Sequence, residues 1–149
     1  MIRELAEYER AGHQVDATVD LLHDALFGPG SATYCHVAER DGAIIGFAVW
    51  FLNFSTWLGR SGIYLEDLYV RPEARGTGAG TALLRRLAAI CVERDYQRLD
   101  WAVLDWNEPS RKFYDSLGAD ALTDWVPYRL TGTALRKLGG DVSAGPAAS

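Results

Sequence analysis

Hydrophobic positions along the chain follow two different periods. Between Tyr34 and Val70, short runs rich in β-branched and aromatic residues are separated by turn residues, which predicts strands. Residues 81–94 instead repeat apolar side chains every three or four positions, which predicts an amphipathic helix. The side chains expected on the buried face of that helix are Leu83, Leu84, Leu87, Ala88 and Cys91. The two periods together predict an α+β fold.

The remaining pattern gives the order of the elements. Thr18 is the expected N-cap of a helix that ends near Phe27, and Asp41-Gly42 predicts a tight turn between two strands. The predicted helices span 2–10, 18–27, 81–94 and 107–118, and the predicted strands span 34–39, 44–53, 64–70 and 98–104, with one or two short strands within 121–130. We expect a single domain over residues 1–138 and a flexible, Gly/Ala/Ser-rich tail over 139–149.

The stretch from Tyr64 to Gly80 combines a strand, a turn and a glycine-rich loop that opens into the helix over 81–94. Pro72 lacks an N–H and cannot continue a strand ladder, so the strand is expected to end at Val70. The free N–H groups and the dipole of a helix N-terminus favour an anion, and glycines let the backbone approach a phosphate closely. This stretch therefore predicts a phosphate-binding loop.

Two common phosphate-binding templates fit the loop poorly. A dinucleotide fingerprint needs Gly-x-Gly-x-x-Gly, whereas the glycines here stand at Gly76, Gly78 and Gly80. A P-loop needs Gly-Lys-Ser/Thr, and no Lys follows Gly80. The spacing from Arg75 through Gly78 to Gly80 is similar to the pyrophosphate loop of the Gcn5-related N-acetyltransferases (GNAT), which bind acetyl-CoA.

The resemblance extends over nearly the whole chain. The segments FLNFSTWLGRSGIYLEDLYVRPEARGTGAG and AVLDWNEPSRKFYDSLGA resemble the diamine branch of that superfamily, which includes spermidine/spermine and thialysine acetyltransferases. The resemblance implies a mixed, mostly antiparallel central sheet flanked by helices, acetyl-CoA as cosubstrate and a homodimer. Members of the superfamily begin with a strand that is not evident before the helix over 2–10, and its loss would leave an open sheet edge.

The resemblance also implies which residues contact the cofactor. We expect the acyl arm to lie along the strand that ends at Val70 and the pyrophosphate to lie on the glycine loop. The residues so implied are Leu68, Val70, Arg75, Gly76, Thr77, Gly78, Ala79, Gly80, Thr81, Asn107 and Tyr114.

Glu66 and Asp67 are acids within an otherwise apolar strand, where unpaired charges are costly. Neighbouring strand residues point to opposite faces, so only one of the two should face the substrate unless a bulge breaks the alternation. Ordinary salt bridges at a strand end are the alternative explanation. The resemblance assigns Glu66 to activating the amine and Asp67 to holding the cationic end of the substrate.

Three aromatic residues are further candidates. Tyr114 could protonate the departing thiolate, although a core aromatic beside Phe113 would look the same in sequence. Trp57 and Trp125 resemble aromatic positions that line the acceptor site, where ring faces attract ammonium groups. Asn107 can serve as a helix cap as well as a cofactor contact.

Composition narrows the class of protein. The net charge of −5 over 149 residues argues against a nucleic-acid binder, which would show a basic face. Cys35 and Cys91 lie in apolar segments without metal-ligand spacing, so both are expected to be small buried hydrophobes, and no metal is expected. No run has the length of a membrane span, and no secretory signal is evident, so a cytoplasmic protein is expected.

The sequence is therefore interpreted as an acetyl-CoA-dependent N-acetyltransferase that acts on a primary amine of a small cationic, polyamine-like acceptor. Direct attack in a ternary complex is favoured, because no Cys or Ser stands beside a candidate base. Two alternatives remain. A lysine- or thialysine-like amino acid acceptor would need an anion site, for which Arg60 or Arg129 is a candidate. The second alternative is a regulatory module that binds CoA but has no catalytic activity.

Overall fold

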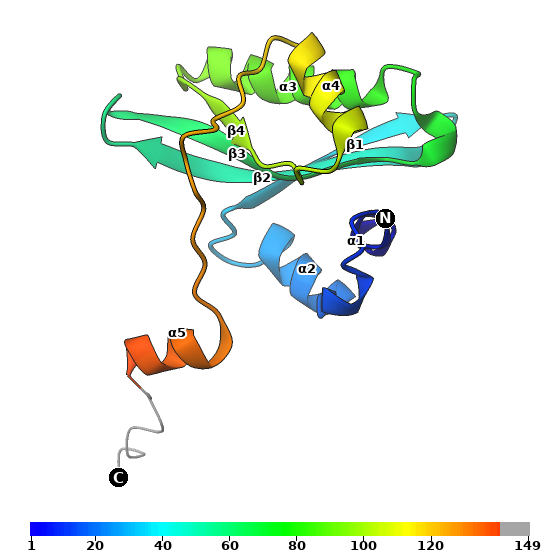
Figure 1. Cartoon of the computed structure of the whole chain (residues 1–149). Helices are drawn as coiled ribbons and strands as arrows, with labels where there is room; N and C mark the ends of the chain where they lie inside the picture. The colour runs from blue at the N-terminus through cyan, green and yellow to red at the C-terminus, as the bar shows by residue number, and fades with distance from the viewer. Residues whose placement is uncertain (141–149) are drawn as a thin grey trace. The chain divides into compact units, whose positions relative to one another are not determined.

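The computed structural model describes residues 1–140, which form helices and a four-stranded sheet (Figure 1). In chain order the elements are α1 (Ile2–Tyr8), η1 (Gly12–Gln14), α2 (Val19–Phe27), β1 (Thr33–Arg40), β2 (Ala43–Ser55), β3 (Arg60–Val70), η2 (Pro72–Ala74), α3 (Ala79–Glu93), β4 (Leu99–Trp101), α4 (Glu108–Ser116) and α5 (Gly132–Gly139). The contacts define one compact unit, Met1–Asn107, and a second that begins at Glu108. The single domain expected over 1–138 stays a prediction.

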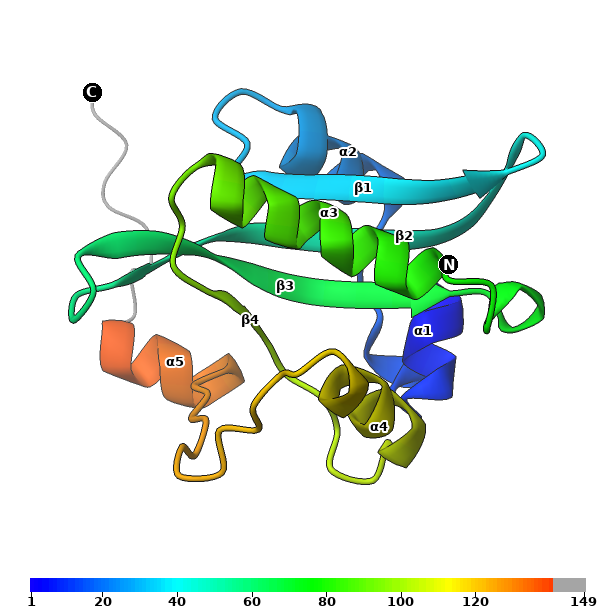
Figure 2. The same ribbon diagram turned by 90° about the horizontal axis from the view of Figure 1, so that it is seen from above.

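The sheet lies entirely in the first unit, with strand order β1-β2-β3-β4. The pairs β1/β2 and β2/β3 are antiparallel, and β3/β4 is parallel, which confirms the expected mixed, mostly antiparallel sheet. Helices α1 and α2 lie on one face and α3 lies along the other (Figures 1 and 2). No further strand pairs with the outer edge of β1 within residues 1–140.

Local signals in the sequence set several boundaries. The Thr18 hydroxyl accepts a hydrogen bond from the Leu21 N–H at 3.2 Å, which confirms the predicted cap of α2. Asp41 and Gly42 both have positive φ, at 53° and 76°, as the predicted tight turn between β1 and β2 requires. These residues therefore form the elements that their local chemistry favours.

The core lies on both faces of the sheet. On one face, Leu5 of α1 packs with Phe47 and Tyr69. On the other, α3 buries Leu83, Leu84, Leu87, Ile90 and Cys91. Two expectations were wrong: Ala88 is exposed while Ile90 takes the buried position, and Cys35 on β1 is exposed.

A β-bulge interrupts the pairing of β2 with β3. Val49 pairs with Asp67, but the next residue of β2, Trp50, pairs with Leu65, which leaves Glu66 without an opposite residue. The extra residue breaks the alternation of side chains along β3. Since Val49 and Phe47 are two residues apart on β2, their partners Asp67 and Tyr69 share the face on which α1 packs.

Two predicted strands need correction. The strand expected over 98–104 covers only Leu99–Trp101, because its pairing with β3 stops at Leu65, immediately before the bulge. The segment 121–130 contains no strand, and Pro127 removes a backbone donor that a ladder would need. Helix α5 was not predicted, and its final residues overlap the start of the tail expected over 139–149. Most of that tail, residues 141–149, lies outside the described residues.

Gly62 of β3 is closely surrounded by other atoms and gives a test of the packing. A Cβ added there would lie 2.6 Å from Asn53 Oδ1, 2.7 Å from Arg98 Cγ and 2.9 Å from the Arg98 backbone oxygen. We expect Gly62→Ala to lower the free energy of unfolding by about 1–3 kcal/mol, as overpacking usually does.

Urea unfolding of the purified variant measures this effect. Gly139→Ala is the matched control, because a Cβ at Gly139 has no atom within 4 Å and needs no positive φ. Equal stability of the two variants would contradict the described packing of β2, β3 and the start of β4.

Candidate active site

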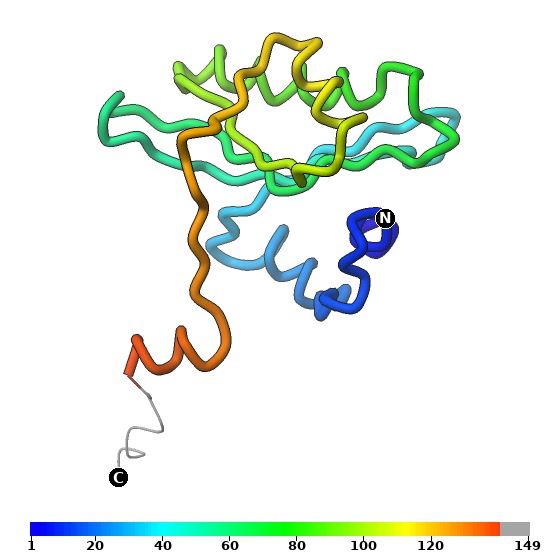
Figure 3. Tube along the Cα trace, viewed as in Figure 1, coloured from blue at the N-terminus to red at the C-terminus, as the bar shows by residue number. Residues whose placement is uncertain are grey.

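The glycine loop joins the end of β3 to the start of α3, at one end of the sheet (Figure 3). Gly76 and Gly78 have positive φ, at 75° and 88°, and Gly78 is the left-handed N-cap of α3. An added Cβ would have no atom within 4 Å at either position, so backbone conformation rather than crowding requires glycine. Helix α3 begins at Ala79, two residues earlier than predicted, so Gly80 lies in its first turn.

The start of α3 has the properties of an anion site. The first N–H groups of a helix have no intrahelical acceptor, and Gly78 supplies no side-chain cap for them. The Thr77 side chain does not cap the helix either. Its hydroxyl donates to the Ala74 carbonyl oxygen at 2.7 Å and stabilises the turn before the helix. The loop therefore offers backbone donors without a side chain over them.

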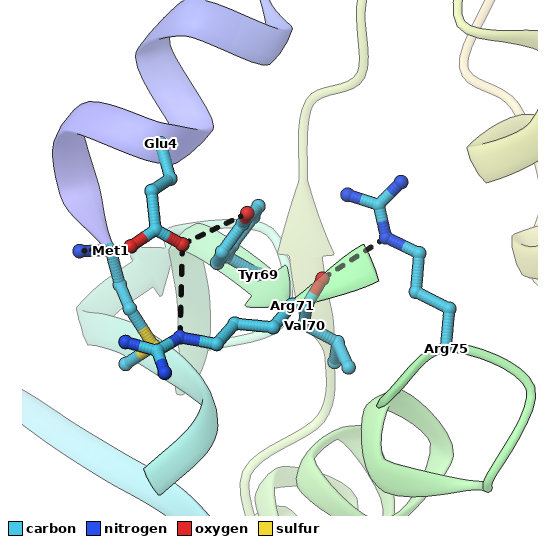
Figure 4. Close-up of polar contacts among 6 residues, drawn as sticks. All are labelled: Met1, Glu4, Tyr69, Val70, Arg71 and Arg75. Atoms are coloured by element: carbon cyan, nitrogen blue, oxygen red, sulfur yellow. Dashed lines mark hydrogen bonds and ion pairs between the residues drawn. The ribbon is translucent and has the colours of Figure 1, made fainter. Parts of the chain in front are cut away.

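Arg75 is held by three contacts in the first unit. Its Nε donates to the Val70 carbonyl oxygen at 3.0 Å (Figure 4). Its guanidinium carbon lies 5.0 Å from the centre of the Tyr8 ring and 5.8 Å from that of Tyr69. The start of the loop is thus fixed to the last residue of β3 and to an aromatic residue of α1.

The last five residues of β3 form an open strand segment beside the loop. Parallel pairing with β4 covers only Ile63–Leu65, so residues 66–70 have no strand partner on that side within the described first unit. Leu68 and Val70 pair with Ala48 and Gly46 of β2 on the opposite side. The sheet therefore opens between β3 and β4, and backbone groups of β3 become available along the opening.

The two acids stand at the beginning of this opening. Glu66 is exposed, and Asp67 is partly buried on the α1 face. Burial raises the pKa of Asp67 to about 6, and the negative charges of Glu66 and Glu9 add to the effect. Neither Glu66 nor Asp67 takes part in an ion pair among residues 1–140, so the salt-bridge explanation is not supported. The bulge is the exception under which the expected alternation of the two acids does not apply.

Asn107 closes the first unit and is 5% exposed, although the residues just before it are exposed. The Tyr8 hydroxyl donates to its Oδ1 at 3.0 Å. The Tyr8 ring also contacts Trp106, with ring centres 6.2 Å apart. Asn107 directly precedes α4, which is the position of the predicted helix cap.

Helix α1 contributes side chains that sequence reasoning missed. Besides Tyr8, Glu4 accepts a hydrogen bond from the Tyr69 hydroxyl at 3.2 Å and lies 3.8 Å from Arg71 Nε (Figure 4). Burial raises the pKa of Glu4. The Tyr69 hydrogen bond and the positive charges of the Met1 amino group and Arg71 together have the larger, opposite effect, so the pKa lies below its usual value. The alternation of charged and apolar residues in α1 indicated a helix but gave no sign of these partners.

The three predicted aromatic residues belong to different parts of the chain. Trp57 is 88% exposed in the hairpin before β3, about 20 Å or more from Glu66 along the strand. Tyr114 belongs to the second unit, on α4, where its ring contacts Phe113 with centres 5.3 Å apart. Trp125 lies between α4 and α5 and is 68% exposed. Roles for these three residues stay predictions.

Comparison with known proteins identifies the family. The profile of the Acetyltransferase (GNAT) family matches residues 1–119. This chain belongs to the GNAT family. It is 37% identical to the mouse thialysine N-epsilon-acetyltransferase, over 94% of this chain and 88% of that protein. It is 33% identical to the human spermidine/spermine N(1)-acetyltransferase-like protein 1, over 80% of this chain but 18% of that protein.

The fold is also found among solved structures. An integron cassette protein from the mobile metagenome of V. cholerae superimposes with a TM-score of 0.77 at 31% identity, covering 91% of this chain and 85% of that chain. The protein is therefore an N-acetyltransferase, and the family uses acetyl-CoA. Within residues 1–140 no set of three or more His, Cys, Asp or Glu side chains could hold a metal ion, and none of the helices could cross a membrane.

The raised pKa of Asp67 predicts how the stability of this GNAT protein depends on pH. A carboxyl whose pKa is higher in the folded state destabilises the fold once it ionises, so its cost grows as the pH rises through about 6. We expect Asp67→Asn to raise the Tm at pH 8 and to raise it much less at pH 4.5.

Thermal unfolding followed by circular dichroism at the two pH values tests this expectation. Glu66→Gln is the control, because it removes only a neighbouring charge from an exposed position and should give a smaller gain at pH 8. If Asp67→Asn raised the Tm equally at both pH values, the pKa of Asp67 would not be raised by folding.

Proposed function

We propose that this acetyltransferase moves the acetyl group of acetyl-CoA to a primary amine of a small cationic acceptor by direct attack in a ternary complex. The observation that carries the proposal is the position of Glu66 and Asp67. The bulge lies where β3 parts from β4, on the strand that leads into the glycine loop, and its two acids have no ion-pair partner among residues 1–140.

The donor half of the proposal rests on the loop. Bare, positive-φ glycines at Gly76 and Gly78 and the uncapped start of α3 fit a pyrophosphate, which prefers backbone donors and a helix N-terminus. The open segment 66–70 offers strand edge groups to an amide-containing acyl arm. The residues proposed to hold the cofactor are Leu68, Val70, Arg75, Gly76, Thr77, Gly78, Ala79, Gly80, Thr81, Asn107 and Tyr114.

The acceptor half rests on electrostatics. Asp67 has a raised pKa because it is partly buried beside Glu66 and Glu9, and no cation among the described residues pairs with it. A bound ammonium group would supply the missing counter-charge and lower the pKa of Asp67. The two curated relatives described above are named for thialysine and for spermidine/spermine, which are amines. A cationic amine is therefore the acceptor class that best fits this site.

The residues divide the chemical work. Acetyl-CoA supplies an acetyl group activated as a thioester. A primary amine titrates near pH ~10.4, so a proton must be removed before it can attack. Exposed Glu66 is proposed to take that proton through water, while Asp67 holds the cationic end of the acceptor. Tyr114 is proposed to give a proton to the departing sulfur.

A thialysine- or lysine-like amino acid is the second candidate acceptor, and the name of the mouse relative favours it. Its carboxylate would need a cationic partner. Arg60 is already paired with Asp95, at 2.9 Å between Nη1 and Oδ2, so it is a weak candidate for that role. Arg129 belongs to the second unit. The homodimer and the acceptor contacts of Trp57 and Trp125 are also kept as proposals.

Substitution of Gly78 tests the donor site. We expect Gly78→Val to abolish acetyl-CoA binding, because a β-branched residue disfavours a φ of 88° and would stand over the backbone donors. Calorimetric titration with CoA measures the affinity. Gly42→Val is the matched control, since Gly42 also has a positive φ but lies in the β1–β2 turn. A folded Gly78→Val protein with normal CoA affinity would contradict the proposal.

Turnover with a panel of amines tests the acceptor. We expect a diamine to have a higher kcat/KM than a monoamine of equal length, because only the diamine leaves a second cation for Asp67. Thialysine belongs in the same panel. A clear preference for thialysine would favour the second candidate, and no turnover with any amine would favour the silent CoA-binding module.

The same panel separates the roles of the two acids. Asp67→Asn should raise KM mainly for the diamine, whereas Glu66→Gln should lower kcat by about 10²–10⁴-fold for every amine and recover in part at high pH, where free amine accumulates. A normal pH–rate profile for Glu66→Gln, or an equal loss for both amines in Asp67→Asn, would reverse or remove these assignments.

A further inference from the structure

Helix α1 reaches both sides of the opening between β3 and β4. The start of α1 is fixed to β3, because Leu5 packs with Phe47 and Tyr69. In addition, the Tyr69 hydroxyl donates a hydrogen bond to Glu4. The last residue of α1, Tyr8, contacts Asn107, which follows β4 in the chain. One short helix therefore contacts both β3 and the segment that follows β4.

Tyr8 makes two chemically different contacts. The face of its ring lies under the Arg75 guanidinium, 5.0 Å from ring centre to guanidinium carbon, which is within the range of a cation–π interaction. Its hydroxyl donates to Asn107 Oδ1 at 3.0 Å. Arg75 begins the glycine loop and Asn107 is the proposed contact from the other side, so Tyr8 joins two parts of the proposed cofactor site.

The hydrogen bond has a consequence for the Asn107 amide. An Asn side chain has a carbonyl oxygen that accepts and an NH₂ group that donates, and a half turn exchanges them. In the structure the Tyr8 hydroxyl donates to Oδ1, and this bond stabilises the orientation in which the carbonyl oxygen faces Tyr8. Because Asn107 is 5% exposed, water has little access to stabilise the other. Tyr8 is therefore one of the partners that hold the Asn107 amide in its orientation.

We propose that Tyr8 is a positioning residue of the cofactor site, which orients Asn107 through its hydroxyl and Arg75 through its ring. The inference rests on the proposed function, because it requires that Arg75 and Asn107 contact acetyl-CoA. Tyr8 itself acts only through these two residues. Nothing in the amino-acid sequence of α1 distinguishes it from an ordinary aromatic residue of an amphipathic helix.

Two substitutions separate the two contacts. Tyr8→Phe removes the hydroxyl but keeps the ring, so it tests the orientation of Asn107 alone. Tyr8→Leu removes both contacts. We expect the Kd for CoA to rise about 3- to 10-fold in Tyr8→Phe, the loss typical of one hydrogen bond, and to rise further in Tyr8→Leu. The KM for the amine should change little in Tyr8→Phe.

A double-mutant cycle with Asn107→Ala gives a result that a merely structural role would not produce. If the hydroxyl acts through Asn107, Tyr8→Phe should have no further effect on CoA affinity once Asn107 is Ala. Tyr34→Phe is the control, because Tyr34 stacks on Trp50 of the sheet, with ring centres 4.4 Å apart. It should leave the Kd unchanged.

Calorimetry and steady-state kinetics on the full chain decide the outcome. Unchanged CoA affinity in Tyr8→Phe, or an effect that stays the same in the Asn107→Ala background, would overturn the inference. A wild-type protein that does not bind CoA would instead overturn the proposed function, so the two failures are distinguishable. A rise in the Kd that Tyr34→Phe reproduces would also count against Tyr8.

Discussion

The bulge at Glu66 is the constraint on which the arrangement of this acetyltransferase depends. One residue without a partner on β2 ends the regular pairing of β3 just after Leu65, which is also the last residue that pairs with β4. The same irregularity therefore opens the sheet and turns Asp67 toward α1. A regular strand would have kept the sheet closed and placed Asp67 on the opposite face.

Charge around the opening is distributed unevenly. On the α1 side, Arg71 has Glu4 as its neighbour at 3.8 Å, and Arg75 is bound to a carbonyl and two rings. Within the described part of the chain the acids at the bulge have no such partner, and burial, Glu66 and Glu9 raise the pKa of Asp67. The first unit thus satisfies its own cations near the loop while it leaves negative charge for a cationic ligand.

Much of this could be predicted from sequence, because the signals are local. Local chemistry sets the backbone conformation at Thr18, at Asp41-Gly42 and at Gly78, and distant parts of the fold do not alter it. The bulge was foreseen only as a possibility, since register depends on the partner strand rather than on β3 itself. The roles of Glu4 and Tyr8 could not be predicted, because their partners are tens of residues away in sequence. The strands expected over 121–130 failed for a related reason: an extended segment needs a partner, which sequence periodicity does not supply.

The contact between Tyr8 and Asn107 joins residues 99 positions apart. Closing so long a loop costs chain entropy, so we expect this contact to form late in folding. During synthesis, the proposed site cannot be completed until residue 107 has left the ribosome. A ligand that binds only the closed form would shift the equilibrium toward that form, so the supply of cofactor in the cell would influence how much of the protein survives proteolysis.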